Sequence, residues 1–439
     1  MYYTDISFLG TRTKVTNNNK STLFLTIGGS PLPIAISLDI LHVEYQQFVL
    51  IHSIETEKIT DKIRDWLKSK YTIELNKINL LCVDSVSPSR VKNEIFKYLK
   101  NSSKDSDYTL GLCYTGGNKI MSLNSYETLS LWSEEHSINF ISYYIDGKTN
   151  QFITENKSTE TMVKLVDFLG KSSGFTVNDI TRLHDWDYDP VFADNQQVVI
   201  QDLLLQIVSL SKDNNDMSKW LRWTKKEFKD KLIKKGKDIS DKDVGDIEIL
   251  LSGSPNLHDT MTKLRQITDI LTGNIQIKTL SKAMRFKRPY TEVCGWFTGK
   301  WLEHWVYFCL KKLQLKDKYI NEISMNATFT STLYFELDVL MTRGYDLFVI
   351  SCTTLSENRQ GGFSDIKKKL FEISIRARQI GGFYANFALV SFVESPKELQ
   401  EQLRNEFLEI PQNVAVFGLN DLIDLELKLD QWIDRCNEK

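Results

Sequence analysis

The chain has 439 residues, of which 41% are hydrophobic and 26% charged, so two or three ordinary globular domains are expected. The formal net charge of −2 argues against indiscriminate adhesion to nucleic acid, although it allows a local basic groove. No apolar run approaches the roughly 20 residues of a spanning helix, and no signal peptide is evident. The six cysteines lack Cys-x-x-Cys spacing. A cytoplasmic protein without a membrane partner is therefore expected.

Residues 22–150 alternate short apolar runs with helical patterns, which predicts a mostly parallel, doubly wound α/β sheet. Ligands of such sheets bind beyond the carboxyl ends of the strands. The predicted strands are Thr22–Ile27, Phe48–Ser53, Ile78–Val83, Tyr108–Tyr114 and Phe140–Ile145. The predicted helices are Pro33–Tyr45, Thr56–Lys70, Pro88–Leu99 and Asn118–Trp132.

The next part of the chain is highly charged and has few strand signals, so we expect residues 159–285 to form a helical segment. Within it, Lys219–Lys237 interleaves many lysines with Trp220, Trp223 and Phe228, and Gly236 is a natural helix stop. Such a segment fits phosphate contacts and base stacking. A solvated helix face is the commoner explanation of a basic run.

Residues 286–439 are expected to contain both helices and strands. The expected helices are Gly299–Leu313 and a basic helix from Ser364 to Gln379. The expected strands are 333–341, 347–353, Phe387–Phe392 and Val414–Phe417. The predicted domain boundaries are therefore 1–158, 159–285 and 286–439.

Two of the predicted strands end in paired glycines, and a helix is expected to follow each pair. Glycine lets the backbone approach a ligand closely, and the N–H groups at a helix start favour an anion. A phosphate-bearing ligand fits these turns, and simple tight strand-to-helix turns are the alternative. The candidate ligand-binding residues are Gly28, Gly29, Ser30, Thr115, Gly116, Gly117, Asn118 and Lys119.

The segment Thr115–Met121 resembles the Thr-Gly-Gly-x-Lys-x-Met signature of CARF domains, the CRISPR-associated Rossmann fold. The segment Ile27–Pro31 is similar to the first-strand loop of that family. The resemblance covers about residues 20–150. It implies that residues 1–158 sense a cyclic oligoadenylate, which a CARF homodimer binds across its two-fold axis.

A second constellation consists of acidic residues near the end of the chain. Glu336 and Asp338 lie two apart on a predicted strand, so both point to one face. Neighbouring carboxylates repel unless a cation joins them, and Mg²⁺ or Mn²⁺ prefers oxygen ligands. Glu303 lies among large apolar residues, where burial of a carboxylate is costly without a partner. Taken alone, Glu303 fits the wet side of an amphipathic helix slightly better, but the acidic strand favours a metal site formed by Glu303 and Asp338.

The order of a helical Glu303, a strand Asp338 and a second apolar strand resembles the PD-(D/E)xK nuclease core. The segments that resemble the nuclease halves of CARF-linked effectors from type III CRISPR systems are Gly299–Glu303, Glu336–Leu340 and Arg376–Gly382. The resemblance implies a restriction-endonuclease-like domain over residues 286–439. In that family a divalent metal ion activates water against a phosphodiester, and a lysine stabilises the developing negative charge.

The sequence departs from this pattern at one pair of positions. Ser351 and Thr353 stand where the family has Glu-x-Lys or Ser-x-Lys. Serine remains a weak ligand, but threonine supplies no cation. The candidate substitutes on the next helix are Lys367, Lys368, Lys369, Arg376 and Arg378.

The resemblances together imply a homodimeric, cyclic oligoadenylate-activated nuclease, with the tetra-adenylate as the expected activator and RNA or DNA as the substrate. The middle segment is expected to relay ligand binding to the active sites. The expected catalytic residues are Glu303, Glu336, Asp338, Ser351 and Lys367. One alternative is a silent sensor that lacks the nuclease lysine. The other is a ring nuclease that degrades the cyclic ligand with Lys119 and Ser30.

Overall fold

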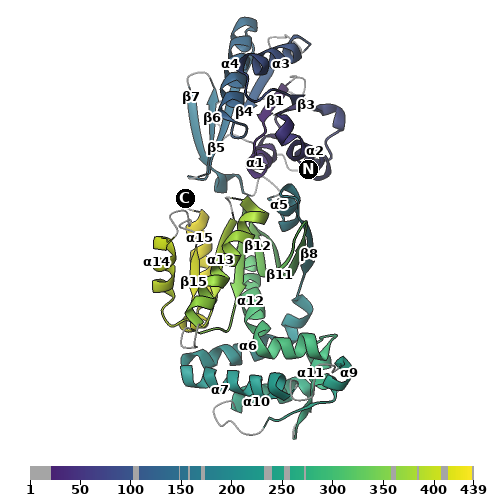
Figure 1. The fold of residues 1–439 in the computed structure, drawn as a ribbon, viewed down its shortest axis with the longest axis vertical. Coiled ribbons are helices and arrows are strands. Elements are labelled where there is room, and N and C mark those ends of the chain that lie inside the picture. The colour runs from purple at the N-terminus through teal and green to yellow at the C-terminus, as the bar shows by residue number, and fades with distance from the viewer. Residues whose placement is uncertain are drawn as a thin grey trace. The chain divides into compact units, whose positions relative to one another are not determined.

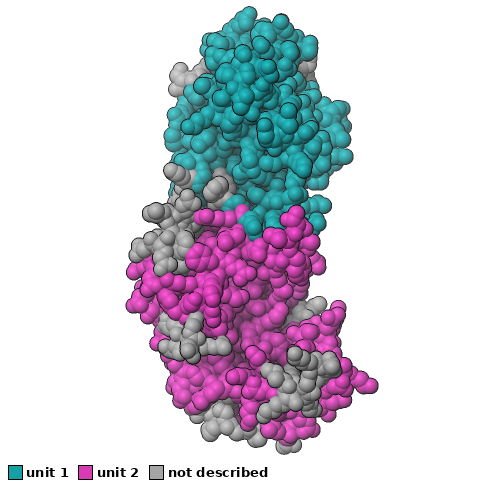
Figure 2. Space-filling view, viewed as in Figure 1, with its two compact units in different colours: residues 1–187, 379–384, 439 teal, residues 188–378, 385–438 magenta. Residues whose placement is uncertain are grey.

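The computed structural model divides into two compact units, residues 1–187 with 379–384 and 439, and residues 188–378 with 385–438 (Figures 1 and 2). No helix in the described part of the chain is long and apolar enough to cross a lipid bilayer. The structure describes residues 21–101, 108–147, 149–156, 159–169, 174–231, 240–251, 258–270, 273–356, 362–382, 385–406 and 414–437.

The first unit is built on a seven-stranded sheet with the order β3-β2-β1-β4-β5-β6-β7. The first five strands in this order are parallel, and β6 and β7 extend the sheet as antiparallel strands. The strands are β1 (Ser21–Thr26), β2 (Gln47–His52), β3 (Ile78–Cys82), β4 (Thr109–Cys113), β5 (Asn139–Asp146), β6 (Gln151–Asn156) and β7 (Thr159–Lys164). The predicted α/β class and doubly wound sheet are confirmed.

The helices of the first unit follow the strands in alternation. They are α1 (Leu32–Leu41), α2 (Glu57–Tyr71), α3 (Pro88–Lys100), α4 (Lys119–His136) and α5 (Val177–Leu183), with short 3₁₀ turns at Ile54–Thr56, Leu75–Lys77 and Leu165–Phe168. Apolar residues of α3 and α4 pack against one side of the sheet around Phe24 and Leu112. Every helix and strand predicted within residues 22–150 is present. Each observed start or end lies within about one helical turn of the predicted one. The hairpin of β6 and β7 was not predicted.

The strand order reverses between β1 and β4. From β1 the chain moves to β2 and β3 on one side, and β4 and β5 lie on the other. The register pairs Leu25 of β1 with Cys113 of β4, so both strands end at the same edge. This edge is therefore the switch point at which doubly wound sheets form ligand-binding crevices.

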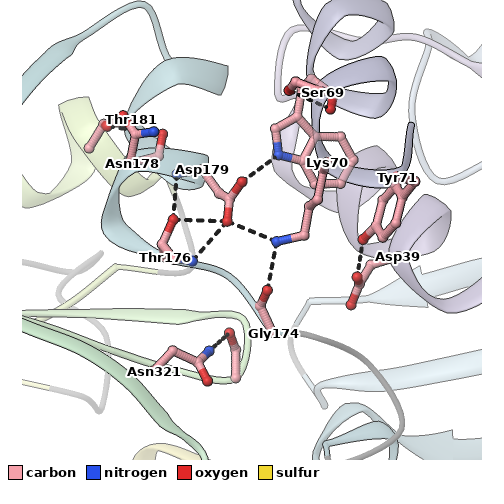
Figure 3. A network of polar contacts seen from close by, with 12 residues as sticks. Asp39, Ser69, Lys70, Tyr71, Gly174, Thr176, Asn178, Asp179, Thr181 and Asn321 are labelled. Atoms are coloured by element: carbon pink, nitrogen blue, oxygen red, sulfur yellow. Dashed lines mark hydrogen bonds and ion pairs between the residues drawn. The ribbon is translucent and has the colours of Figure 1, made fainter. Parts of the chain in front are cut away.

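A polar network joins α5 to α2 in the first unit (Figure 3). Asp179 accepts hydrogen bonds from Lys70 Nζ at 2.8 Å and from Trp66 Nε1 at 2.9 Å. Thr176 and Asp179 form a capping box at the start of α5, in which each side chain bonds the other's backbone N–H. Lys70 also donates to the Gly174 carbonyl oxygen at 2.8 Å. One buried carboxylate thus fixes the helix start and the preceding segment on α2.

The second unit contains a six-stranded sheet with the order β15-β14-β13-β12-β11-β8. Its strands are β8 (Asp187–Val191), β11 (Ile320–Thr330), β12 (Tyr334–Arg343), β13 (Asp346–Cys352), β14 (Ala385–Val390) and β15 (Ala415–Phe417). Strands β11 to β13 form an antiparallel meander, and β13, β14 and β15 are parallel. The long helices around this sheet are α12 (Trp301–Lys316), α13 (Gly362–Gly381), α14 (Pro396–Glu406) and α15 (Leu425–Asn437), with a 3₁₀ turn at Leu419–Asp421.

A group of helices precedes α12 in the chain and belongs to the same unit. It comprises α6 (Asp194–Ser209), α7 (Asn214–Thr224), α9 (Asp241–Gly245), α10 (His258–Thr268) and α11 (Ile277–Ala283), a 3₁₀ turn at Leu210–Lys212, π-helical turns at Lys225–Asp230, Pro289–Cys294 and Trp296–Lys300, and a two-stranded ribbon of β9 (Glu248–Ile249) and β10 (Ile275–Gln276). Residues 159–187, by contrast, lie in the first unit. The helices share one continuous hydrophobic core with α12.

Two aromatic residues of the basic segment lie inside this core, and Trp223 packs against it. Trp220 and Phe228 are fully buried, and the ring of Phe228 stacks on Phe297 with a centroid distance of 4.2 Å. Trp223 donates its indole N–H to the Leu250 carbonyl oxygen. These rings stabilise the fold and are not arranged as a stacking platform for bases. Gly236 lies outside the described residues.

We predict that Asp179→Asn destabilises the first unit by about 2–3 kcal/mol at neutral pH, because it leaves the largely buried Lys70 ammonium without a counter-ion. Thermal unfolding of the full chain measures this change. Asp185→Asn is the matched control. Its ion pair with Lys62 is largely solvated and contributes less than about 1 kcal/mol.

The difference in stability between wild type and Asp179→Asn is expected to depend on pH. Burial raises the pKa of Asp179, but hydrogen bonding and charge from Lys70 outweigh burial and hold the pKa below its usual value. The stabilisation is therefore complete above the unfolded pKa of about 4 and disappears as pH falls through the folded value. A difference between wild type and Asp179→Asn that stayed constant from pH 7 to pH 3 would contradict this account.

Candidate functional site

The acidic residues predicted near the end of the chain gather around the start of α12. Glu303 is on the first turn of this helix and is 9% exposed. Burial, followed by the negative charge of Asp338, raises the pKa of Glu303 to about 8. The Oε2 atom of Glu303 is buried and has no hydrogen-bond partner among the described residues. The wet-face explanation of Glu303 is therefore wrong, since its carboxylate lies inside the unit beside other acids.

Asp338 lies in the middle of β12 and is held by the neighbouring strand. Its Oδ2 atom accepts hydrogen bonds from Ser351 Oγ at 2.9 Å and from the Cys352 N–H at 2.7 Å. Ser351 is buried at the end of β13. Strand pairing places Val339 opposite Ile350, so Asp338 and Ser351 are cross-strand neighbours. Ser351 therefore orients Asp338.

Two polar residues that had no predicted role complete this cluster. Lys300 Nζ lies 3.0 Å from Asn326 Oδ1 and 3.6 Å from Glu336 Oε1. The Asn326 side chain also hydrogen-bonds to Glu303 and lowers its pKa against the effect of burial. Asn326 belongs to β11, which was not predicted, although residues 323–330 alternate apolar and polar side chains with the period of a strand.

The remaining predicted residues lie on β13, just after it, and on α13. Thr353 follows β13, and its N–H donates to the Val390 carbonyl oxygen, so this position continues the strand pairing without supplying a charge. Lys367 lies on α13, where its ammonium is 5.1 Å from the centre of the Phe363 ring. Lys368 pairs with Asp365 on the same helix. Lys369 is close enough to act electrostatically on the Cys352 thiol.

The carboxylates fit a divalent metal ion that retains water ligands. No three His, Cys, Asp or Glu side chains in the described ranges converge closely enough to hold an ion alone. Mg²⁺ is usually held by one or two carboxylates together with waters and substrate phosphates. The Oε2 atom of Glu303 is a buried carboxylate oxygen that has no hydrogen-bond partner among the described residues. Glu303 and Asp338 are thus a suitable pair of direct ligands.

The two glycine-rich loops lie side by side at the switch point of the first unit. Gly28 and Gly117 are in backbone contact, because a Cβ atom built on Gly28 would lie 2.8 Å from the Gly117 nitrogen. A Cβ on Gly116 would lie 2.2 Å from the Thr26 carbonyl oxygen. Gly117 has a φ of +75°, which favours glycine. By contrast, Gly29 faces open space.

Several predicted ligand-binding side chains have structural partners. Asn118 caps α4 by accepting from the Met121 N–H at 2.9 Å and donates to the Ser85 carbonyl oxygen. Thr115 Oγ1 accepts from the Ile145 N–H at 2.8 Å, which links β4 to β5. Lys119 is exposed at the first position of α4, and Ser30 is partly exposed near the start of α1. The backbone of both loops, Ser30 and Lys119 remain as candidate ligand contacts.

We predict that Gly116→Ala destabilises the first unit by about 1–3 kcal/mol, because the new methyl group overlaps a backbone oxygen that cannot move away. Gly29→Ala is the control and should change stability by less than about 0.5 kcal/mol. Calorimetric unfolding of both full-length variants measures the difference. Equal melting temperatures would show that the loops are not packed as described.

Comparison with known proteins supports the assignment of both parts of the chain. Residues 291–434 match the family "Card1-like, endonuclease domain". The structure is similar to that of protein VC1899 from Vibrio cholerae, with a TM-score of 0.70 and 16% identity over 95% of this chain and 99% of the other. It is also similar to Can2 from Sulfobacillus thermosulfidooxidans in complex with cyclic tetra-adenylate, with a TM-score of 0.64 and 15% identity over 94% and 99%. No curated protein matches the sequence significantly.

The matches agree with the two motif resemblances found in the sequence. The family match covers α12, the meander of β11 to β13 and α13, which contain the acidic cluster. The two structural similarities extend over nearly the whole of each chain. The expected likeness is thereby confirmed: residues 291–434 match the Card1-like endonuclease family, and the fold of the whole chain is similar to the folds of VC1899 and Can2.

Proposed function

We propose that the protein is a metal-dependent nuclease that is activated by a cyclic oligoadenylate, the tetra-adenylate in particular, and cuts RNA or DNA in type III CRISPR antiviral defence. The observation that carries the catalytic part is the buried Glu303 carboxylate with an unpartnered oxygen, next to Asp338 and Glu336. Its place within a Card1-like endonuclease domain supports nuclease chemistry over a purely structural role.

Each residue of the cluster has a distinct part in this proposal. Glu303 and Asp338 hold Mg²⁺ or Mn²⁺, and Glu336 adds negative charge at the rim. When bound, such an ion acts as a Lewis acid on a phosphoryl oxygen and lowers the pKa of water. The Ser351 hydroxyl and the Cys352 N–H keep Asp338 in one orientation. Lys367 and its neighbours on α13 neutralise substrate phosphates.

The activator site is proposed at the paired glycine loops of the first unit. Phosphate groups fit the N–H groups of these loops and the starts of α1 and α4. Lys119 adds a point charge at the same place. Can2, which has a similar fold, is described in complex with cyclic tetra-adenylate. The proposal includes a cytoplasmic homodimer in which ligand binding favours the state with ordered active sites, and sedimentation with and without ligand tests the dimer.

We predict that the wild-type protein cleaves RNA or single-stranded DNA when both Mn²⁺ and cyclic tetra-adenylate are present. Asp338→Ala should reduce kcat by about 100-fold or more, which corresponds to about 3 kcal/mol of transition-state stabilisation. Labelled RNA, single-stranded DNA and supercoiled plasmid are assayed side by side. Asp365→Ala removes an exposed carboxylate from α13 and should leave the rate within about threefold.

One outcome would favour a silent sensor instead. Thr353 stands at the usual lysine position, and the Thr353 backbone only continues the strand pairing. A wild-type protein that binds the activator and Mn²⁺ but cuts none of the three substrates would support that function.

We predict that Lys119→Ala weakens binding of cyclic tetra-adenylate by about tenfold, because a charged hydrogen bond to phosphate contributes about 1.5–3 kcal/mol. Isothermal titration calorimetry on the full chain measures the affinity. Lys97→Ala is the control, since Lys97 is an exposed lysine of α3 that pairs with Glu94. An unchanged affinity in Lys119→Ala would place the activator elsewhere.

The same titration samples test the ring-nuclease alternative. After incubation, the ligand should be recovered intact by chromatography. Linear products formed by the wild type but not by Lys119→Ala would instead assign degradation of the ligand to this loop.

A further inference from the structure

The nuclease site needs a positive charge that its second strand does not carry. Hydrolysis forms a bond from a water oxygen to phosphorus and breaks the bond to the leaving oxygen, so negative charge grows on the phosphoryl oxygens. A lysine or arginine at the site stabilises that charge without itself changing covalently. Neither Ser351 nor Thr353 can do so. If the protein is a nuclease, another part of the chain has to supply this cation.

Lys300 is the lysine that the structure places among the carboxylates. It immediately precedes α12, three residues before Glu303, so both side chains emerge on the same side of the helix start. Its ammonium group is 3.6 Å from Glu336 Oε1 and 3.0 Å from Asn326 Oδ1. The Lys300 side chain is 42% exposed, so its ammonium also reaches solvent, where a substrate phosphate would approach.

The surroundings hold Lys300 in this position from two sides. The His304 ring is 6% exposed, and its Nδ1–H donates to the Lys300 carbonyl oxygen at 3.0 Å. Asn326 has a φ of +48° inside β11, a sparsely populated conformation that surrounding structure must impose. This backbone geometry accompanies the hydrogen bond that Asn326 makes to the ammonium group.

The lysines of α13 have other partners. Lys367 lies over the Phe363 ring, and Lys368 pairs with Asp365 at 3.3 Å. Lys369 acts on the Cys352 thiol, which makes it the nearest competitor.

We infer that Lys300, at the start of α12, supplies the active-site cation that replaces the missing strand lysine. This inference rests on the proposed nuclease function and identifies the group that makes it possible despite Thr353. In the metal-free protein, Lys300 neutralises part of the carboxylate charge. With substrate bound, its ammonium group faces the phosphoryl oxygens at the same rim.

The test separates charge stabilisation from a structural role by measuring cleavage and metal binding in the same full-length variants. Lys300→Met should lower kcat by about 100-fold. Its affinity for Mn²⁺, titrated calorimetrically without substrate, should be unchanged or higher, because a cation that repels the metal has been removed. Lys300→Arg should recover part of the activity. Lys311→Met is the matched control, since Lys311 lies on α12, has a similar exposure of 35% and pairs with Asp194 at 3.3 Å.

Each contrary result is distinguishable. If the wild type cleaves and Lys300→Met cleaves equally well, the inference is wrong while the nuclease function stands. A loss of cleavage in Lys369→Met or Lys367→Met without a loss in Lys300→Met would place the cation on α13. Parallel loss of Mn²⁺ binding and folding in Lys300→Met would make the residue structural. A wild type that binds Mn²⁺ and never cleaves would overturn both proposals.

Discussion

A carboxylate removed from water needs compensating charge, and the structure of the second unit around α12 depends on how Glu303 meets this need. The helix buries Trp301 and Leu302 beside Glu303, so apolar packing forces the acid out of solvent. Nearby carboxylates make its ionised form still less favourable. Asn326 and Lys300 offset part of that unfavourable energy. This arrangement is the structural basis of the proposed metal site, because perturbed carboxylates of this kind are typical of functional sites.

The neighbouring strand β13 holds the second carboxylate of the cluster, Asp338, in place. Asp338 keeps its orientation through the Ser351 hydroxyl and a backbone N–H, neither of which carries a charge. Loss of the strand lysine therefore leaves the geometry around Asp338 intact and removes only the positive charge. Because electrostatic stabilisation depends on the position of a charge and not on the element that carries it, a lysine that immediately precedes α12 is a chemically sufficient source.

In the first unit, the glycine loops combine tight packing with an open surface. Gly28, Gly116 and Gly117 permit two strand-to-helix turns to touch through their backbones, while Gly29 borders open space. Thr115 and Asn118 are committed to holding β4 and α4 in place. In the proposed activator site, recognition of an anionic ligand therefore depends on backbone N–H groups and Lys119. A phosphate-rich ligand suits such a surface better than one read through many side chains.

The sequence alone determined the alternating elements of residues 22–150, the switch-point loops and the identity of the acids, because hydrophobic periodicity and glycine placement are local properties. The period-2 pattern of residues 323–330 was also present, and it predicts β11 once it is noticed. Only the tertiary structure decided that Trp220 and Phe228 are core residues. It also decided that Thr115 and Asn118 have structural partners, and that Lys300 and Asn326 join the acidic cluster. These facts depend on contacts between residues that are distant along the chain, and no local pattern encodes which buried carboxylate a given lysine will approach.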